Sequence, residues 1–229
     1  MKIGGLQRLS MVDFPGKLAA VVFTIGCNFH CPFCHNPELV EGDTALLSEE
    51  SVWDFLSTRT KLIEGIVISG GEPTLHQDLP AFIKKIKALG FSVKLDTNGS
   101  NPEMLSELTN AQLLDFVAMD IKHTWPRYAF STGLNAAPIE KIQQSATFLL
   151  NGNVDYEFRT TVIKDFHDPM DIINISRQIC GAKCYAVQEF IPKKTLSKDF
   201  AQKLPFEKQS LEALIPEISK YVQSFEIRQ

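Results

Sequence analysis

Three cysteine thiols lie within one short stretch of the chain, Cys27-Asn28-Phe29-His30-Cys31-Pro32-Phe33-Cys34. Their spacing, C-x3-C-x-aromatic-C, is neither the paired C-x2-C of a zinc ribbon nor the four-thiolate run of a ferredoxin. Three thiolates around one metal centre leave a coordination position for a ligand that is not protein, as catalytic metal sites do. The spacing therefore favours an open metal centre. A disulfide-bearing loop, a zinc site completed from elsewhere in the chain and buried thiols are the alternatives.

Further polar side chains lie where the sequence pattern predicts strand ends. Gly70-Gly71-Glu72-Pro73 would let backbone approach a ligand and adds a carboxylate, although an ordinary turn is the alternative. Asp96-Thr97-Asn98-Gly99 suits hydroxyl or cation binding, and its alternative is also a turn. Asp120 and Lys122 fall on the same side of a strand, as a structural ion pair or a ligand clamp. Arg159 is costly to bury without an anion, so we expect it to face the site.

Six apolar or β-branched runs predict buried strands, and they span residues 18–25, 65–69, 91–95, 114–121, 156–163 and 185–191. Continuous apolar runs are typical of strands covered on both faces in a parallel sheet. The cysteine loop follows the first strand, and the next three strands deliver the polar segments to the same edge. This edge is where open α/β sheets and α/β barrels place their ligands.

Helices are predicted between these strands from capping and periodicity signals, over residues 48–60, 78–89, 139–150, 168–180 and 211–225, and a further helix is predicted to start at Asn101. The regions 123–138 and 192–206 read as loops, the second with several lysines. Strands alternating with helices, with connections suited to right-handed crossovers, predict a parallel (β/α)6 arrangement. The fold class we expect is therefore α/β.

Length and composition predict one domain over residues 1–229, because 44% hydrophobic content is enough for a full core. The formal net charge of -4 and the lack of a long basic run make nucleic acid and an anionic membrane unexpected partners. No apolar stretch has the length of a transmembrane helix and no signal-peptide core is seen, so we expect a cytoplasmic protein. Cys180 and Cys184 are expected to be packing thiols, with a redox or metal role as the alternative.

The N-terminal half of the chain resembles the activating proteins of anaerobic ribonucleoside-triphosphate reductases, which are glycyl-radical-enzyme activases of the radical S-adenosylmethionine (SAM) superfamily. The cysteine spacing carries the resemblance to the superfamily. Val12-Asp13-Phe14-Pro15-Gly16 and Cys34-His35-Asn36-Pro37 carry the narrower resemblance to the activases. It continues through the polar segments that end the next three strands. Pyruvate formate-lyase activases are similar at the same places and are the alternative within the superfamily.

The resemblance implies a partial (β/α)6 barrel with two cofactors, a [4Fe-4S] cluster and SAM. Cys27, Cys31 and Cys34 would ligate three irons of the cluster. Activases with extra clusters carry a cysteine-rich insert after this motif, whereas here no cysteine occurs between Cys34 and Cys180. Glu72 would take the SAM amino group. Asp96, Asp120 and Lys122 would organise the SAM carboxylate or a nearby monovalent cation. Phe33 would lie near the adenine. The complete predicted cofactor-binding set is Phe33, Gly70, Gly71, Glu72, Asp96, Asn98, Asp120, Lys122 and Arg159.

The resemblance also implies an oxidoreductase. The reduced cluster would cleave SAM, and the resulting 5'-deoxyadenosyl radical would take a hydrogen atom from a glycine Cα of the anaerobic ribonucleotide reductase. No catalytic side chain is predicted, because the cofactors carry the chemistry. An electron donor such as flavodoxin or ferredoxin is the second expected partner. The alternative from a different class is a non-catalytic iron-sulfur or zinc protein, which leaves Gly70-Gly71-Glu72-Pro73 unexplained.

Overall fold

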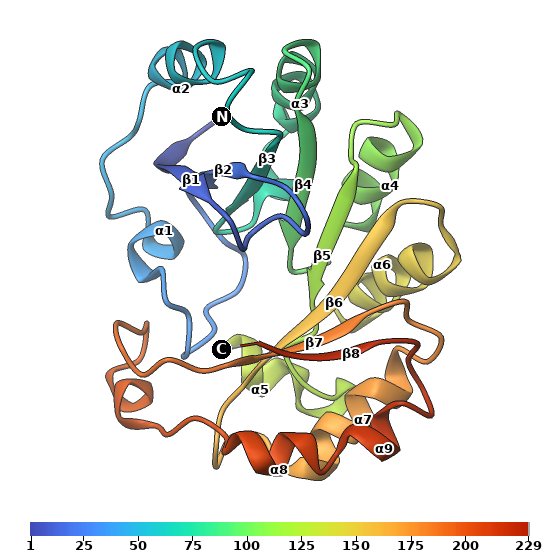
Figure 1. The fold of residues 1–229 in the computed structure, drawn as a ribbon. Helices are drawn as coiled ribbons and strands as arrows, with labels where there is room; N and C mark the ends of the chain where they lie inside the picture. The colour runs from blue at the N-terminus through green and yellow to red at the C-terminus, as the bar shows by residue number, and fades with distance from the viewer. Residues whose placement is uncertain (229) are drawn as a thin grey trace. The chain divides into compact units, whose positions relative to one another are not determined.

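The computed structural model describes residues 1–228. Its strands form one eight-stranded sheet in which they follow one another in chain order (Figure 1). They are β1 (Ile3–Ser10), β2 (Ala19–Thr24), β3 (Gly65–Gly70), β4 (Ser92–Thr97), β5 (Phe116–Asp120), β6 (Asp155–Val162), β7 (Tyr185–Glu189) and β8 (Phe225–Arg228). Pairing is parallel from β2 to β4 and from β6 to β8, and antiparallel between β1 and β2. The predicted α/β class with a mostly parallel sheet is confirmed.

The chain divides into two compact units. The first comprises residues 1–28, 38–97 and 101–117, and the second comprises 29–37, 98–100 and the chain from Ala118 onward. Neither unit is continuous in sequence, and the cysteine loop passes from the first to the second after Asn28. The single domain expected for residues 1–229 stays a prediction.

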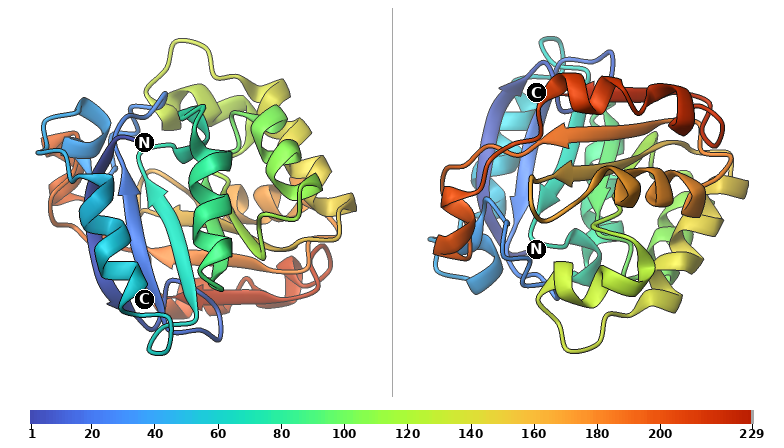
Figure 2. Two further views of the ribbon diagram at one scale, coloured as in Figure 1. Left: turned by 90° about the horizontal axis from the view of Figure 1, so that it is seen from above. Right: turned by 90° about the horizontal axis from the view of Figure 1, so that it is seen from below.

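The helices are α1 (Pro37–Glu41), α2 (Glu49–Ser57), α3 (Leu79–Ala88), α4 (Pro102–Asn110), α5 (Tyr128–Thr132), α6 (Ile139–Asn151), α7 (Pro169–Gln178), α8 (Lys208–Glu212) and α9 (Ile215–Ile218). In the first unit, α2 and α3 cover the same face of the strands (Figure 2, left). They meet through Trp53 and Phe82, whose ring centroids are 4.7 Å apart. The strands beneath them are buried, as the continuous apolar runs predict.

Side-chain caps explain where the predicted helices begin. Ser48 accepts a hydrogen bond from the backbone N–H of Ser51 at the start of α2. Asn101 does the same for Met104 at the start of α4. In the second unit, Asp168 forms a reciprocal capping box at the start of α7. Each cap satisfies backbone donors that the first helical turn leaves unpaired, so these sequence signals fixed the helix starts correctly.

All six predicted strands are found with limits within two residues of those expected. The helix predicted over residues 211–225 is wrong, because this stretch holds only α8 and α9 before β8 begins. Pro216 explains the break, since proline is accommodated in the first turn of α9 but cannot continue a helix that started earlier. The region 123–138 is not wholly a loop, because it contains α5. Within residues 1–228, none of the helices combines the length and apolar character needed to cross a bilayer.

Candidate cofactor-binding site

Gly70, the last residue of β3, and Gly71 after it lie against the end of β2 and the residues that follow it in the first unit. A Cβ added at Gly70, whose φ is +117°, would lie 2.3 Å from the backbone nitrogen of Thr24. A Cβ added at Gly71 would lie 2.0 Å from the carbonyl oxygen of Gly26. The sequence reasoning expects these glycines to admit a ligand, whereas the space beside each is filled by protein backbone. Strand packing therefore explains the need for glycine, and a role in cofactor binding stays a prediction.

The carboxylate of Glu72 is fully buried and held in a fixed orientation. Its Oε1 accepts hydrogen bonds from the backbone N–H of Thr74 at 3.1 Å, from Thr74 Oγ1 at 2.5 Å and from Thr97 Oγ1 at 2.8 Å. Its own backbone N–H donates to the carbonyl of Gly26, directly before Cys27. Hydrogen bonds to a carboxylate are strong, so Glu72 is preorganised as an acceptor of the kind that an ammonium group requires.

The two threonines around Glu72 are not in the predicted site. Thr74 follows the glutamate by two residues and lies in the 3₁₀ turn Pro73–Leu75, which Glu72 caps. A side chain that bonds backbone two residues on is a recognised turn signal, so Thr74 could have been found from sequence. Thr97 belongs to a segment that the sequence analysis names, but its contact with Glu72 depends on the pairing of β3 with β4.

A buried ion pair occupies the end of β4. Lys94 is 1% exposed, and its Nζ lies 2.6 Å from Oδ1 of Asp96. A buried charge needs a partner, so Lys94 explains how the Asp96 carboxylate is tolerated there. Lys94 was missed, although the same alternation rule that pairs Asp120 with Lys122 also pairs residues 94 and 96. A cation bound at Asp96 would have to share this carboxylate with Lys94.

The second unit holds the cysteine loop from Phe29 onward. Within residues 1–228 no cysteine is recorded in a disulfide, which argues against the alternative of a disulfide-bearing loop. The backbone of the loop is fastened by three hydrogen bonds, from His30 N–H to Thr132, from Leu196 N–H to Cys34 and from Ser197 N–H to Pro32, at 2.8, 3.0 and 2.9 Å. The second half of the loop is therefore positioned by protein contacts on two sides.

Phe33 packs among other aromatic rings of the second unit. It is 4% exposed, and its ring centroid lies 5.6 Å from that of Phe166 and 6.2 Å from that of Phe200. This packing anchors the loop between Cys31 and Cys34, which is sufficient reason for an aromatic side chain at this position. The predicted contact of Phe33 with adenine is not tested by these contacts and stays a prediction.

Three charged side chains of the second unit come together at the ends of β5 and β6. Oδ2 of Asp120 lies 2.8 Å from Nζ of Lys122, and Oδ1 lies 2.9 Å from Nε of Arg159. Burial alone would raise the pKa of Asp120, but Arg159 and Lys122 lower it to about 2. Burial lowers the pKa of Lys122, whereas Asp120 and the nearby Cys31 raise it well above its usual range. The trio therefore carries a net positive charge beside Cys31.

Asn98, also predicted as a site residue, stabilises its own loop. It is buried, and its Oδ1 accepts a hydrogen bond from the backbone N–H of Ser100 at 2.9 Å. Gly99 between them has a φ of +75°, and a Cβ there would lie 2.1 Å from the terminal methyl of Met119. The turn interpretation of this segment is therefore satisfied by its local contacts. A direct contact of Asn98 with SAM stays a prediction.

Two buried side chains hold the main chain of Lys122, and neither is in the predicted site. The Lys122 N–H donates to the hydroxyl oxygen of Tyr128 at 3.2 Å, and this hydroxyl donates to the Asp120 carbonyl at 3.2 Å. Nε2 of His167 lies 3.1 Å from the Lys122 carbonyl, while its Nδ1 accepts from the backbone N–H of Ile163. The proton of the neutral ring is therefore on Nε2, and Lys122 is fixed through both of its backbone groups.

Replacing Tyr128 by phenylalanine is expected to weaken SAM binding while destabilising the protein by about 2 kcal/mol, because its hydroxyl makes two buried hydrogen bonds, each typically worth about 1 kcal/mol. Tyr156→Phe is the matched control, because the Tyr156 hydroxyl accepts a hydrogen bond from another backbone N–H, that of Lys183, at 3.3 Å. Tyr156→Phe should lose about 1 kcal/mol of stability in urea titrations, and only Tyr128→Phe should raise the Kd for SAM. Equal SAM affinity in the two variants would show that Tyr128 has a structural role alone.

The buried His167 makes stability depend on pH. Burial lowers its pKa from 6.5 to about 3, so between these values the unfolded chain binds a proton that the folded protein does not. The contribution is complete above pH 6.5 and is lost as the pH falls toward 3, by up to about 1.4 kcal/mol per pH unit. His167→Gln keeps a donor for the Lys122 carbonyl without a titrating ring. Urea unfolding between pH 4 and 7 should show a shallower slope for this variant, and parallel slopes would contradict the assignment.

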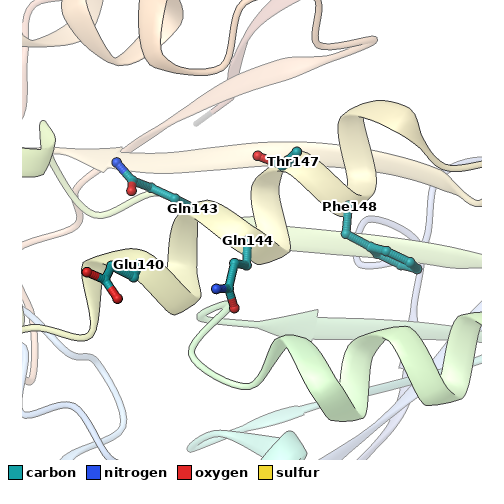
Figure 3. Close-up of a pocket in the computed structure, with 5 residues that line it drawn as sticks. All are labelled: Glu140, Gln143, Gln144, Thr147 and Phe148. Atoms are coloured by element: carbon teal, nitrogen blue, oxygen red, sulfur yellow. The ribbon is translucent and has the colours of Figure 1, made fainter.

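A hollow of about 570 Å³ on the surface of the second unit contains no predicted site residue. Figure 3 shows that all five of its lining side chains come from α6, and they are Glu140, Gln143, Gln144, Thr147 and Phe148. Among residues 1–228, no group of three or more His, Cys, Asp or Glu side chains is arranged as ligands of a metal ion. The ligand set Cys27, Cys31 and Cys34 stays a prediction from the cysteine spacing.

The sequence of the chain from β2 to the first turn of α7 decides its family. Residues 21–173 match the sequence profile of the radical SAM superfamily. The chain belongs to this superfamily. The cofactors of the family are a [4Fe-4S] cluster and SAM, as predicted from the cysteine spacing and the resemblance.

Relatives narrow the assignment to one branch of the superfamily. A protein of Methanocaldococcus jannaschii, described as a candidate glycyl-radical enzyme activating enzyme, is 36% identical over 234 residues, which cover 99% of this chain and 95% of the relative. The pyruvate formate-lyase-activating enzyme of Listeria monocytogenes is 31% identical over 152 residues, 60% of each chain. The protein therefore belongs to the glycyl-radical-enzyme activase family, and the prediction of an enzyme is confirmed.

Solved structures share the fold at low sequence identity. SuiB of Streptococcus suis, crystallised with S-adenosylmethionine, gives a TM-score of 0.71 at 12% identity over 91% of this chain and 50% of that chain. A domain of a pyruvate-formate lyase-activating enzyme from Bacteroides vulgatus gives 0.58 at 15% identity, covering 72% of this chain and 99% of that chain. These likenesses confirm the radical SAM fold.

The residues present fit the two cofactors of the family. Thiolates are the ligands of iron-sulfur clusters, and the cysteine loop supplies three cysteine side chains of this kind. SAM carries an ammonium and a carboxylate group on its methionine part. In the first unit, the buried carboxylate of Glu72 has the charge to accept an ammonium group, and in the second unit, the positive trio around Lys122 has the charge to bind a carboxylate.

Proposed function

We propose that this protein activates an anaerobic ribonucleoside-triphosphate reductase by generating a glycyl radical on it. The observation that carries this choice is the resemblance of the N-terminal half of the chain as a whole to the reductase activases. The match to the Methanocaldococcus jannaschii relative over nearly the whole chain supports an activase of this compact size. Activation of pyruvate formate-lyase is the second candidate, favoured by the 31% identity to the Listeria monocytogenes enzyme.

The proposed site assigns a binding role to each of its residues. Cys27, Cys31 and Cys34 hold the cluster through their thiolates. When bound, the two cofactors supply the reductive cleavage of SAM and a radical that takes a hydrogen atom from the glycine. Glu72 accepts the SAM ammonium group, and Lys122 binds the SAM carboxylate. No side chain of this chain needs to move a proton, so the protein serves to orient the reactants and exclude water.

Asp120 and Arg159 belong to the proposed site through Lys122. Arg159 neutralises the Asp120 carboxylate at 2.9 Å, so the charge of Lys122 stays available for a ligand although Asp120 also contacts it. A monovalent cation near Asp96 and Asp120, as the family resemblance implies, would compete with the lysine and arginine partners of these aspartates. We therefore place Lys122, rather than a cation, as the main positive contact of the SAM carboxylate.

The proposal includes the setting of the reaction. The protein acts in the cytoplasm as a single radical SAM domain, without nucleic acid. Its protein substrate is the reductase, and flavodoxin or ferredoxin supplies one electron for each cleavage of SAM. Phe33 and Asn98 are the remaining residues proposed to contact SAM.

The test is anaerobic reconstitution with iron and sulfide, followed by reduction and addition of SAM. 5'-Deoxyadenosine is measured with the anaerobic reductase, with pyruvate formate-lyase and with neither, and glycyl radical is measured by electron paramagnetic resonance. A radical signal on the reductase supports the proposal. A signal on pyruvate formate-lyase alone would select the second candidate, and cleavage without a signal on either would move the substrate elsewhere.

A further inference from the structure

The segment that follows β7 lies along the cysteine loop within the second unit. The backbone N–H of Leu196 donates to the carbonyl of Cys34 at 3.0 Å, and that of Ser197 donates to Pro32 at 2.9 Å. On the other side of Cys34, the His35 ring stacks on Phe190 at 5.3 Å, and its Nδ1 lies 3.2 Å from the carbonyl oxygen of Lys194. The course of this segment is therefore fixed relative to Cys34.

This segment is also a local concentration of positive charge. Residues 192–203, here called the lysine segment (orange in Figure 1), contain four lysines and one acid, Asp199, although the whole chain carries a net charge of -4. The lysines are Lys193, Lys194, Lys198 and Lys203. Lys193 and Lys198 are exposed, as is His35 beside Cys34. A cationic surface thus adjoins the last thiol of the cysteine loop.

We propose that the lysine segment is the docking face for an acidic one-electron donor protein of the flavodoxin type, an inference that rests on the proposed function. The reduced flavin loses one electron and is oxidised, and the cluster gains this electron and is reduced. No atom is transferred. Because electron transfer requires the two redox groups to come close, the donor must approach the cysteine loop. The backbone hydrogen bonds to Cys34 and Pro32 place the lysine segment on that approach.

Charge selects the donor rather than the glycyl radical enzyme as the partner at this face. Complementary charge raises association rates and orients the encounter, which suits a carrier that must bind, deliver an electron and leave. The glycine of the substrate enzyme must instead reach SAM, whose proposed contacts are Glu72 and Lys122. The lysine segment hydrogen bonds to the thiol loop and is therefore better placed for electron entry.

Direct binding gives the first test. The double variant Lys193→Glu with Lys198→Glu changes two exposed side chains, and its Kd for a reduced or oxidised flavodoxin is measured by calorimetry at low salt. We expect the Kd to rise by about tenfold or more, and its salt dependence to become weaker. The matched control is Lys61→Glu with Lys84→Glu, which makes the same change in net charge at exposed residues of the first unit. An unchanged Kd in the lysine-segment variant, or an equal loss in the control, would overturn the proposal.

SAM cleavage gives the second test, with two reductants. With photoreduced flavodoxin, the lysine-segment variant should need about tenfold more donor for half-maximal cleavage, whereas cleavage driven by dithionite should be unchanged. Impaired activation of the reductase with dithionite, together with normal flavodoxin binding, would assign this face to the substrate enzyme and overturn the proposal. Absence of dithionite-driven cleavage in the unaltered protein would instead contradict the proposed function, while the binding titration would still decide the docking face.

Discussion

Replacing Cys31 by alanine is expected to abolish both cluster assembly and SAM cleavage. Three thiolates must hold the cluster, and Cys31 is the middle cysteine of the loop and 7% exposed. The next cysteine in the sequence after Cys34 is Cys180. The measurements are iron and sulfide content, visible absorption and 5'-deoxyadenosine formation after anaerobic reconstitution. All three should fall to the level of protein that was never given iron.

Cys180→Ala is the matched control for this experiment. Cys180 is exposed, follows α7 and lies far along the sequence from the cysteine loop. The control protein should assemble as much cluster as the unaltered protein, because a packing or surface thiol has no part in ligation. Full cluster content in Cys31→Ala would remove Cys31 from the ligand set, and loss of cluster in Cys180→Ala would revive the alternative of a metal role for that thiol.

Substituting alanine for Gly71 should lower the stability of the protein, because the added methyl group would clash with the main chain. The new methyl group would lie 2.0 Å from the carbonyl oxygen and 2.6 Å from the carbonyl carbon of Gly26, and main chain cannot yield as a flexible side chain can. Overpacking of this kind costs about 1–3 kcal/mol or more. Because Gly26 precedes Cys27 and accepts the N–H of Glu72, both the cluster loop and the SAM contact should be displaced.

Urea unfolding of the protein without iron isolates the steric part of this effect. The control is Gly5→Ala, whose added methyl would lie 3.6 Å from the ring of Phe23, an ordinary contact distance. Alanine in place of a strand glycine is neutral or slightly stabilising, so the control should stay within about 1 kcal/mol of the unaltered protein. Comparable stability of the two variants would refute the close approach between β2 and the turn after β3.

The strands from β2 to β7 could be predicted because each contains an apolar or β-branched run. Such a run indicates a buried strand even when the neighbouring strands are unknown. β1 and β8 are harder to predict, since Gly4, Gly5 and polar residues dilute the first, and the second has only Phe225 and Ile227 alternating with charges. Both strands form because they pair with β2 and β7, and such pairing is decided by tertiary structure. Pro216 was a readable signal against one long terminal helix.

The candidate site likewise contains residues that local sequence patterns predict and residues that only tertiary contacts bring together. Strand alternation placed Asp120 with Lys122, and the expectation that Arg159 finds an anion is met by Asp120. The same rule would have found Lys94, which was overlooked because its run reads as apolar. Tyr128 and His167 could not be predicted, because α5 and the loop before α7 contact Lys122 only in the folded chain and leave no periodic signal in the sequence.

The fastening of Lys122 has a consequence for the dynamics of ligand capture. Its amide proton is held by a buried hydroxyl and its carbonyl by a buried imidazole, so this amide should exchange with solvent only when the surrounding part of the second unit opens. A ligand that meets Lys122 then loses little affinity to ordering of the main chain, because folding has already ordered it. Adaptation to a bound molecule must therefore come from the lysine's own rotamers, on a timescale of nanoseconds or faster.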